Sequence, residues 1–377
     1  MDGANRYLRD QVLQDLEHKM VFVAGPRQVG KTTMARSLPG AEAGYLNWDV
    51  PEHRERILRR ELPPGDLWIF DEIHKFRSWR DFLKGLYDAR QTTGTSARQR
   101  ILVTGSARLE FYRYSGDSLQ GRYHLLRLHP LSVAELGLET TVDLADLLTL
   151  GGFPEPYLGG SEVEARRWSR EYRNLLIREE LTSLERIQDL GHLELLALRL
   201  PELVGSLLSI NALREDLQVS HKTMAHWLDV LERLYALFRL APLGHPKIRA
   251  IKKAQKHYQF DWSTVPDPAA RFENLVASHL LKWVQHQQDT QGLDLELRYF
   301  RDTDGREVDF VVTDRRGPRL LVECKSGDAA VDRSLGYLKK RFPEAEAWQI
   351  SAQGEKDFQS PEGIRIAPAV TFLRRLV

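Results

Sequence analysis

The segment Gly25–Thr33 has the sequence GPRQVGKTT, in which glycines, a lysine and a hydroxyl residue have the spacing of a phosphate-binding loop. Glycines let the backbone amides turn toward an anion at the positive end of the following helix. Lys31 can reach the β- and γ-phosphates of a nucleotide, and the hydroxyl of Thr32 can ligate Mg²⁺. The sequence therefore predicts that this loop binds ATP with Mg²⁺. The predicted binding residues are Gly25, Pro26, Arg27, Gln28, Val29, Gly30, Lys31, Thr32 and Thr33.

Two acidic residues, Asp71 and Glu72, follow the apolar run LWIF downstream of this loop. Asp71 could hold the Mg²⁺ through water, and Glu72 could orient or deprotonate the water that attacks the γ-phosphate. By itself, an apolar strand that ends in two acids is more often a strand followed by a solvated turn. Together with the phosphate-binding loop, the pair predicts that ATP is hydrolysed and not only bound.

Ser106 and Arg122 are two further candidates for a catalytic role at the nucleotide. Ser106 follows the apolar run RILVTG, so its side chain could face the γ-phosphate, or it could instead cap a helix that begins there. Arg122 lies in LQGRYHLL, where it could contact the nucleotide of a neighbouring subunit. An ordinary surface arginine at the start of a strand is an equal alternative.

Charged residues also interrupt two apolar runs near the C-terminus, in REVDFVV and RLLVECK. Side chains alternate between the two faces of a strand, so Glu307 and Asp309 share one face of the first run. Val308 and Phe310 are expected on the opposite face.

The turn TDRRGP would join the two runs as a hairpin. In the second run, Glu323 and Lys325 share a face by the same alternation. If the hairpin is symmetrical about Arg316, Asp309 lies opposite Glu323. Glu307 then lies opposite Lys325, with opposing residues about 5 Å apart.

Two carboxylates this close repel each other unless a cation or a proton lies between them, and hard oxygen ligands suit Mg²⁺ or Mn²⁺. A helix upstream carries Glu273, which could be an added ligand, and a lysine could orient a water or stabilise negative charge. The possible metal-dependent site therefore consists of Glu273, Asp309, Glu323 and Lys325. The alternative is an exposed ion pair between Glu307 and Lys325, with acids that keep a sheet edge soluble.

The segment NALREDLQVSHKTMAHWLDVLERLYALFRLAPL has the pattern of a helix-turn-helix that ends in a short β-wing. Asn211 would cap the first helix, QVS would form the turn, and Ser220 would cap the second helix. The second helix would then present His221, Lys222 and His226 to a DNA backbone or groove. The alternative is a plain helical bundle that packs domains together.

A basic run from Lys247 to Lys256 follows, with five Lys or Arg residues and no acid. It could neutralise several phosphates of a nucleic acid. The commoner explanation for such a run is a solvated strand face.

Five short apolar runs predict the strands of the N-terminal part: MVFVAG, AGYLNWD, DLWIFDE, RQRILVTGS and GRYHLLRLHP. Apolar strands that alternate with helices predict a parallel sheet covered on both faces. Residues 131–190 are expected to be helical, interrupted by a loop, GGFPEPYLGG. From about residue 270 we expect a helix, three strands, and then a helix, a strand and a helix.

The composition limits the class of protein. The formal net charge of the 377 residues is +1, so any surface for a nucleic acid or a membrane must be local. The single cysteine, Cys324, excludes an intrachain disulfide and fits a reducing compartment. The first residues lack an apolar signal core, and no apolar run approaches the roughly 20 residues that span a bilayer. A cytoplasmic protein without a membrane partner is expected.

Several segments together resemble a widespread prokaryotic family of AAA+-type ATPases: GPRQVGKTT, IFDEIHK, ILVTGSAR, SLQGRYHLLRLHPLSVAEL and GGFPEPYL. The similarity extends over nearly the whole chain, and family members usually carry a C-terminal domain of uncharacterised function. The resemblance places Ser106 at the sensor position and makes Arg122 the best candidate for an arginine finger or sensor. Related ATPases often assemble as rings, which implies a homo-oligomer such as a hexamer.

The constellation Glu273, Asp309, Glu323-x-Lys325 resembles the PD-(D/E)xK nuclease superfamily, which includes restriction enzymes and archaeal Holliday-junction resolvases. Val308 stands where the nominal motif has a proline, at a position that varies. The resemblance implies a nuclease-like C-terminal domain, whether or not it still cleaves.

The predicted fold class is therefore α/β, with four parts. Residues 1–130 form a P-loop AAA+ ATPase core, 131–192 a helical lid or linker, 193–245 a winged helix-turn-helix, and 246–377 an α/β PD-(D/E)xK nuclease-like domain.

The leading functional hypothesis is an ATP-driven motor that acts on duplex or branched DNA, with Mg²⁺ or Mn²⁺ at the C-terminal site as a further cofactor. The main alternative is a nucleotide-dependent regulatory or defence switch, in which the C-terminal domain is an effector or contact module. A scaffold with vestigial sites is a third reading, against which the intact loop Gly25–Thr33 argues.

Overall fold

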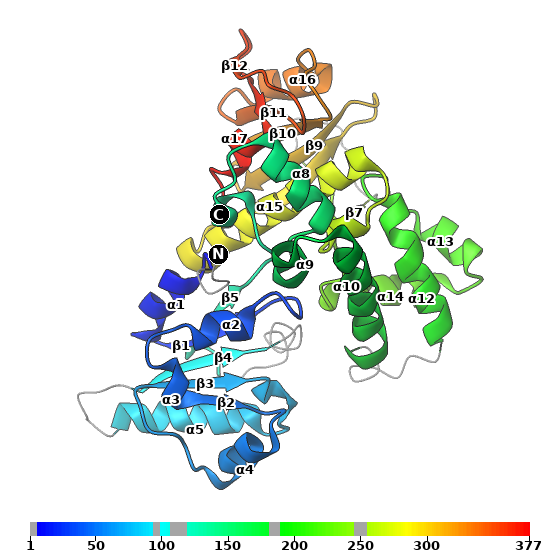
Figure 1. The fold of residues 1–377 in the computed structure, drawn as a ribbon. Coiled ribbons are helices and arrows are strands. Elements are labelled where there is room, and N and C mark those ends of the chain that lie inside the picture. The colour runs from blue at the N-terminus through cyan, green and yellow to red at the C-terminus, as the bar shows by residue number, and fades with distance from the viewer. Residues whose placement is uncertain (1–5, 93–98, 106–118, 181–188, 245–254) are drawn as a thin grey trace. The chain divides into compact units, whose positions relative to one another are not determined.

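The computed structural model describes residues 6–92, 99–105, 119–180, 189–244 and 255–377 (Figure 1). The chain divides into two compact units. The first comprises Met1–Pro130 with Asp289–Gln291, and the second comprises Leu131–Gln288 with Gly292–Val377. Among the described residues, no helix combines the length and the apolar character needed to cross a membrane.

The first unit contains a five-stranded sheet in which all strands are parallel, as the sequence predicted. Its spatial order is β2-β3-β4-β1-β5, so β4 lies between β1 and β3. Residues that follow these three strands therefore meet at one edge of the sheet. The strands are β1 (Met20–Ala24), β2 (Tyr45–Asn47), β3 (Leu67–Asp71), β4 (Arg100–Thr104) and β5 (Tyr123–Arg127).

Helices cover both faces of this sheet, with α1 and α2 on one face and α5 on the other (Figure 1). Along α5, Trp79, Phe82 and Leu83 recur at helical spacing and enter the core. There Trp79 packs against Phe22, and Phe82 packs against Phe70. The helices are α1 (Arg9–Leu16), α2 (Lys31–Arg36), α3 (Ala41–Gly44), α4 (Pro51–Arg59), the 3₁₀ turn η1 (Ile73–Lys75) and α5 (Trp79–Thr92).

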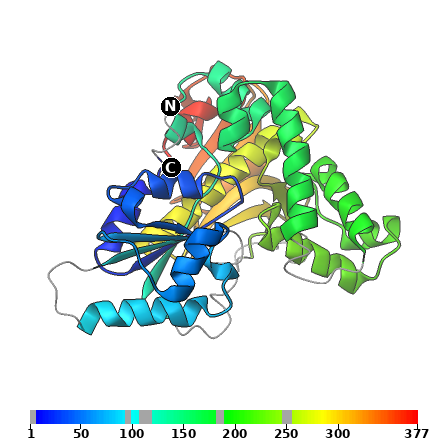
Figure 2. The same cartoon turned by 60° about the horizontal axis from the view of Figure 1, so that its bottom comes forward.

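The second unit begins with helices, drawn in green in Figure 2. The segment GGFPEPYLGG, expected to be a loop, contains the helix α9 instead. Pro154 fits the first turn, where no backbone N–H is needed, and Gly160 ends the helix with a φ of 66°. The elements are α7 (Val133–Leu136), α8 (Thr141–Leu150), α9 (Pro154–Gly159), α10 (Glu162–Leu175), the π turn η3 (Leu176–Glu180), α12 (Leu190–Arg199) and the 3₁₀ turn η4 (Leu200–Leu203).

A pair of helices and a two-stranded sheet follow. The strands β6 and β7 pair antiparallel, so the boundary predicted at residue 245 falls between two strands of one sheet. The elements are α13 (Ile210–Asp216), α14 (His221–Arg233), β6 (Leu237–Leu240), β7 (Lys256–Gln259) and the 3₁₀ turn η5 (Trp262–Thr264).

The caps of α13 and α14 differ in how well the sequence predicted them. Ser220 caps α14 as expected, since its Oγ accepts a hydrogen bond of 3.0 Å from the backbone N–H of Thr223. The expectation that Asn211 caps α13 is wrong. Ser209 holds that position, and its Oγ accepts from the N–H of Ala212 at 3.2 Å. Both residue types favour caps, and the helix begins one residue before Asn211.

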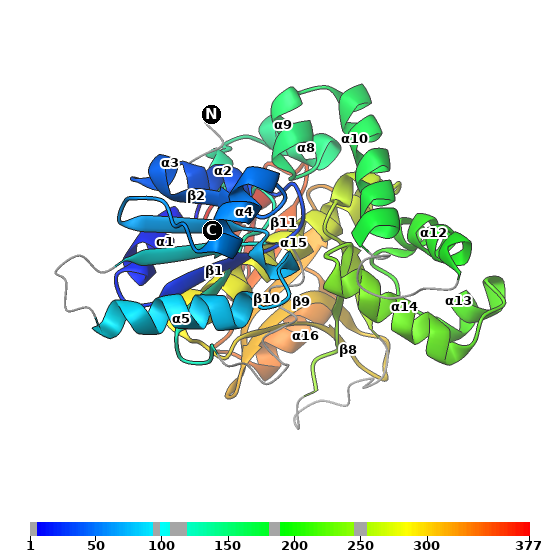
Figure 3. The ribbon, with the colours of Figure 1, turned by 90° about the horizontal axis from the view of Figure 1, so that it is seen from below.

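The C-terminal part of the second unit is a six-stranded mixed sheet of order β12-β13-β11-β10-β9-β8. The helices α15 and α16 lie on opposite sides of β9 and β10 (Figures 1 and 3). The elements are α15 (Pro268–Gln291), β8 (Glu296–Arg301), β9 (Glu307–Asp314), β10 (Gly317–Lys325), α16 (Arg333–Arg341), β11 (Glu346–Ser351), β12 (Phe358–Gln359), β13 (Arg365–Pro368) and α17 (Ala369–Leu373).

The hairpin of β9 and β10 keeps the predicted register over most of its length. Val322 lies opposite Phe310, as expected for a hairpin symmetrical about Arg316. Near the turn, Gly317 lies opposite Asp314, one residue away from that symmetry. A register shift between these two pairs, of the kind that a β-bulge produces, accounts for the difference.

A second irregularity breaks the predicted alternation along β9. Val308 and Val311 pair with Phe300 and Arg298 of β8, which have one residue between them. On β9, two residues, Asp309 and Phe310, lie between Val308 and Val311. Such a bulge re-aims side chains. Val308 and Val311 both join the core cluster that contains residues of α16, while the ring centroid of Phe310 lies 5.7 Å from that of Tyr258. Val308 and Phe310 thus do not pack in one layer, contrary to expectation.

Candidate functional site

The phosphate-binding loop connects β1 to α2 through backbone conformations that favour glycine. The φ angles of Gly25, Gln28 and Gly30 are 152°, 58° and 95°. A Cβ atom on Gly25 would lie 2.2 Å from the carbonyl oxygen of Leu128. Only glycine therefore fits at the start of the loop.

Lys31 and Thr32 begin α2 and direct their polar atoms toward the loop and the end of β3. The Nζ of Lys31 is buried and donates to the carbonyl oxygens of Gly25 at 3.0 Å and of Pro26 at 2.5 Å. The Oγ1 of Thr32 donates to Oδ2 of Asp71 at 2.8 Å. A hydroxyl and a carboxylate, both hard oxygen ligands suited to Mg²⁺, are thus adjacent at the end of the loop.

Asp71, the last residue of β3, also accepts hydrogen bonds from two residues that the sequence analysis did not name. Thr104 Oγ1 donates to Oδ1 at 2.6 Å, and the hydroxyl of Tyr45 donates to Oδ2 at 2.7 Å. Burial, and then the charge of Asp71, raise the pKa of Tyr45, so the phenol remains a donor. The signal for Thr104 was its place at the end of the run RILVT, on the strand between β1 and β3.

Glu72 follows with a left-handed φ of 56°, and its backbone N–H donates to the carbonyl of Thr104 at 2.9 Å. Its Oε2 is buried and has no hydrogen-bond partner among the described residues, although Lys75 Nζ lies 3.5 Å away. Burial raises the pKa of Glu72, and the positive charges of Lys31 and Lys75 oppose this rise. Because this oxygen has only the longer contacts with Lys75 and with Nε2 of His74, at 3.6 Å, it is suited to accept a proton from water.

The other two candidates of the nucleotide site stay predictions. Ser106 lies outside the described residues, and its role stays a prediction. Arg122 precedes β5, whose first residue Tyr123 lies opposite Met20, the first residue of β1. Arg122 is therefore at the far end of the sheet from its own phosphate-binding loop, roughly 16 Å along a five-residue strand. Its Nε pairs with Oδ1 of Asp88 at 2.9 Å. A role toward a neighbouring subunit stays a prediction.

In the second unit, the four residues of the possible metal site lie around one centre. The backbone N–H of Asp309 donates to Oε2 of Glu323 at 3.3 Å, and Lys325 Nζ donates to Oε1 of Glu323 at 2.8 Å. Lys256 connects the fourth residue: its Nζ lies 3.2 Å from Oε1 of Glu273 and 4.0 Å from Oδ1 of Asp309. No local pattern in the sequence connects Lys256 with this centre.

The cross-strand ion pair between Glu307 and Lys325, which was the alternative to a metal site, is not formed. Oε1 of Glu307 lies 2.6 Å from Lys256 Nζ, and its Oε2 lies 3.2 Å from Arg301 Nη1. Lys325 pairs with Oδ2 of Asp332 at 2.9 Å, besides Glu323. The expectation of a solvated strand face is also wrong for Lys256, whose exposed fraction is 2%.

Electrostatic effects at this centre are strong because its groups are buried. Burial, and then the carboxylates of Glu273 and Glu323, raise the pKa of Asp309. Burial lowers the pKa of Lys256, but the neighbouring carboxylates outweigh this effect and raise it overall. Within the described ranges, no group of three or more His, Cys, Asp or Glu residues is arranged to hold a metal ion. The metal at this centre stays a prediction.

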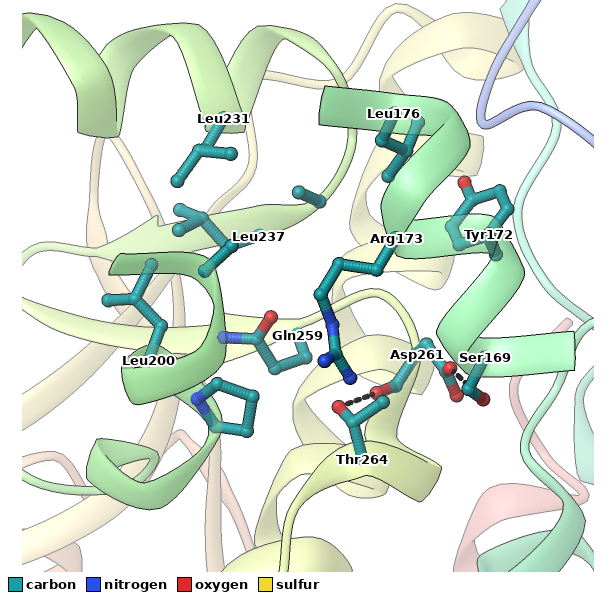
Figure 4. Close-up of a pocket in the computed structure, with 13 residues that line it drawn as sticks. Ser169, Tyr172, Arg173, Leu176, Leu200, Leu231, Leu237, Gln259, Asp261 and Thr264 are labelled. Carbon is teal, nitrogen blue, oxygen red and sulfur yellow. Dashed lines mark hydrogen bonds between the residues drawn. The ribbon is translucent and has the colours of Figure 1, made fainter. Parts of the chain in front are cut away.

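A small cavity of about 50 Å³ lies among α10, η4, β6 and η5 in the second unit (Figure 4). The side chain of Arg173 extends into it toward Asp261 (Figure 4). Asp261 accepts hydrogen bonds of 2.6 Å from the hydroxyls of both Ser169 and Ser263, while burial raises its pKa. Burial lowers the pKa of Arg173. A cavity of this size has room for a few water molecules and not for a nucleotide.

Two mycobacterial proteins are similar to this chain. An uncharacterized protein of Mycobacterium bovis and one of Mycobacterium tuberculosis are each 27% identical to it over 361 residues, which cover 88% of this chain and 78% of each relative.

Solved structures show weaker similarity. A Walker-type ATPase of Pyrococcus abyssi has a TM-score of 0.41 and 15% identity, over 72% of this chain and 96% of that one. A RuvB mutant of Thermotoga maritima has a TM-score of 0.28 and 18% identity, over 61% and 88%. The replication initiator DnaA, bound to AMPPCP and single-stranded DNA, has a TM-score of 0.30 and 16% identity, over 61% of this chain and 88% of that one. At these TM-scores the likeness supports no conclusion about function.

Models of three protein families match successive parts of the chain. Residues 17–137 match an AAA domain family, and this range contains the phosphate-binding loop, Asp71 and Glu72. Residues 141–266 and 269–372 match two families described as domains of unknown function, DUF8612 and DUF4143. The chain therefore carries an AAA+ ATPase domain, followed by two further domains of unknown function.

Proposed function

We propose that this protein is an ATPase that uses hydrolysis to act on duplex or branched DNA. The proposal that it acts on DNA rests on the element order of α13, α14, β6 and β7. Two helices followed by a two-stranded sheet are the order of a winged helix. We further propose that the subunits form a ring, in which Arg122 serves the nucleotide of a neighbouring subunit.

In hydrolysis, the side chains near the ends of β1, β3 and β4 would have separate roles. When bound, Mg²⁺ neutralises charge on the phosphate oxygens. Thr32 and Asp71, which are already in contact, offer the hard oxygen ligands that fit this ion. Lys31 would exchange its contacts with the loop carbonyls for the β- and γ-phosphates. Glu72 would take the proton of the attacking water.

The pH profile of hydrolysis is expected to reflect the raised pKa of Glu72. The base acts only when ionised, and burial raises its pKa above the ordinary value of about 4.3. As the pH falls, protonation therefore removes the base at a higher pH than an ordinary carboxylate would show. The measurement is kcat at saturating ATP and Mg²⁺ as a function of pH. An acid limb centred at or below the ordinary value would contradict this role.

The start of α14 is the part of the chain we assign to the DNA backbone. His221 and Lys222 are exposed in the first turn of α14, whereas Met224, Leu228 and Leu231 further along the helix are buried. The helix is thereby held by its apolar face and presents a basic end outward, as a recognition helix does.

Replacing Lys222 by Ala is expected to weaken DNA binding several-fold and to lower the slope of log K against log salt concentration by about 1. The reason is the loss of one phosphate contact. Anisotropy titrations with duplex and four-way-junction DNA at several salt concentrations measure this. Arg59→Ala is the matched control, since Arg59 is an exposed basic residue on α4, outside the parts of the chain assigned to DNA. Equal affinities of the two variants would reject α14 as the DNA-binding face.

Coupling of ATP hydrolysis to DNA tests the proposal as a whole. ATPase rates are compared without DNA and with single-stranded, duplex and four-way-junction DNA, with Lys31→Ala as the inactive control. Stimulation by duplex or branched DNA supports the proposal. A protein that binds no DNA even at low salt would refute it.

The C-terminal domain is included in this proposal as a second DNA-binding element with a centre of nuclease form. Glu273, Asp309, Glu323 and Lys325 support it, because the charges lie around one centre as the nuclease resemblance implies. Incubation of the same DNA substrates with Mg²⁺ or Mn²⁺ decides whether this centre cleaves, with Asp309→Ala as the control.

The second candidate function is a nucleotide-dependent regulatory or defence switch, in which the C-terminal domain is an effector or contact module. The buried ammonium of Lys256 among the carboxylates favours it, because these groups are already neutralised within the protein. Slow hydrolysis that is indifferent to DNA, with a stable ADP-bound state, would distinguish the switch from the motor.

A further inference from the structure

Lys256 is a buried cation at the point where three acidic side chains converge. Its exposed fraction is 2%. Its Nζ lies 2.6 Å from Oε1 of Glu307, 3.2 Å from Oε1 of Glu273 and 4.0 Å from Oδ1 of Asp309. Lysines are almost never fully buried unless they are paired. The acidic side chains therefore account for the burial of this one.

The converging groups come from three separate elements. Glu273 lies on α15, Glu307 and Asp309 lie on β9, and Lys256 lies on β7. Three carboxylates that approach one point repel each other unless a cation compensates their charge. Oxygen atoms from several carboxylates around one positive centre are also the surroundings that Mg²⁺ or Mn²⁺ takes in proteins.

The surrounding structure fixes Lys256 in this position. Its backbone pairs with Leu240 of β6 and forms an isolated bridge to Leu207. Two residues further along β7, the hydroxyl of Tyr258 donates to Oε1 of Glu273 at 2.6 Å. Asp309 Oδ2 accepts from the backbone N–H of Cys324 at 2.9 Å. The position of the ammonium is therefore fixed by β7, because the same strand also binds Glu273 through Tyr258.

We propose that Lys256 is a built-in cation that takes the place of a divalent metal ion among Glu273, Glu307 and Asp309. The centre of the wild-type protein then excludes metal, since the ammonium already occupies the point on which the oxygen atoms converge. With the lysine in place the three acids are not arranged to hold a metal ion. Removal of this charge is proposed to let the same three side chains close on Mn²⁺ or Mg²⁺. The inference rests on the nuclease-like centre of the proposed function, but not on the action of the protein on DNA or on ATP.

The experiment is a titration of the full-length, nucleotide-free protein with MnCl₂, followed by calorimetry and by electron paramagnetic resonance of free Mn²⁺. Wild type is expected to bind no Mn²⁺ at this centre. Lys256→Gln removes the charge and keeps a polar side chain, and it is expected to bind one Mn²⁺ per chain at least about tenfold more tightly than wild type, because a unit charge within a few ångström is lost. Lys256→Arg keeps the charge and is the matched control, expected to behave like wild type.

The double variant Lys256→Gln/Asp309→Asn locates the new site. It is expected to lose the Mn²⁺ binding that Lys256→Gln gains, whereas binding at the phosphate-binding loop would be the same in both variants. Because no DNA or nucleotide is present, failure of the DNA proposal leaves this result unaffected.

Other outcomes decide against the proposal. Wild-type binding of Mn²⁺ that Asp309→Asn abolishes would show that the lysine does not exclude metal. A folded Lys256→Gln protein that binds no Mn²⁺ would show that the acids do not form a site. If Lys256→Gln unfolds more easily, its thermal unfolding is followed with and without Mn²⁺. Recovery with Mn²⁺ supports the proposal, and no recovery overturns it.

Discussion

Replacement of Glu72 by Gln is expected to lower kcat for ATP hydrolysis by about 10²–10⁴-fold, the usual contribution of a general base. Glutamine keeps the size of the side chain, but it cannot accept a proton from water. ATP binding should change little, because Lys31 and the loop residues that would hold the phosphates are untouched. The measurements are steady-state ATPase rates and the affinity for a labelled nucleotide.

Glu61→Gln is the matched control for this substitution, because Glu61 is an exposed glutamate that precedes β3. It is expected to hydrolyse ATP as wild type does. A Glu72→Gln protein whose kcat stays close to that of wild type would exclude Glu72 as the base. The base would then have to be one of its neighbours at this edge of the sheet.

Replacement of Trp262 by Ala is expected to lower the free energy of unfolding of the second unit by about 3–5 kcal/mol. The indole is 1% exposed, and its Nε1 donates to the carbonyl oxygen of Leu147 at 2.9 Å. Its ring also lies beside His279, with 5.9 Å between the centroids. The substitution would leave a large cavity and remove one of the two hydrogen bonds that the carbonyl oxygen of Leu147 accepts, the other coming from the N–H of Gly151. Denaturant unfolding followed by circular dichroism measures the loss.

Gly152 provides a test that the loss arises from this packing. A Cβ atom on Gly152 would lie 2.3 Å from Cη2 of Trp262, so Gly152→Ala alone is expected to cost about 1–3 kcal/mol. In the Trp262→Ala background the clash with the indole is absent and only a 3.0 Å approach to the carbonyl oxygen of Leu131 remains. The double variant should therefore lose less stability than the sum of the two single losses. Strict additivity would show that the two residues do not interact.

The ATPase part was largely predictable from the sequence because its signals are local. The glycines and Lys31 lie within one short loop, and the carboxyl pair Asp71 and Glu72 follows directly on an apolar strand. Apolar runs alternating with helices also fixed the parallel sheet, since both of its faces must be covered. The contacts of Asp71 with Thr104 and Tyr45 were not predictable, because they depend on the order in which the strands lie side by side.

The boundaries and caps of helices were predicted less accurately from the sequence, for a related reason. Serine, asparagine and proline are compatible with more than one local structure, and the surrounding contacts select among them. Ser209 instead of Asn211 at the start of α13, and a helix instead of a loop at Pro154, are two such cases.

The sequence by itself determined the nucleotide loop, its acidic pair and most of the register of the C-terminal hairpin, because each of these depends on residues close together in the chain. Only the tertiary structure decided what those charges meet. The sequence suggested that Lys256 belongs to a basic surface run. In the structure it is buried between Glu273 and Glu307, which lie on two other elements. A contact between residues so far apart in the chain leaves no periodic signal, and it arises because a buried carboxylate group needs a cation that another strand can supply.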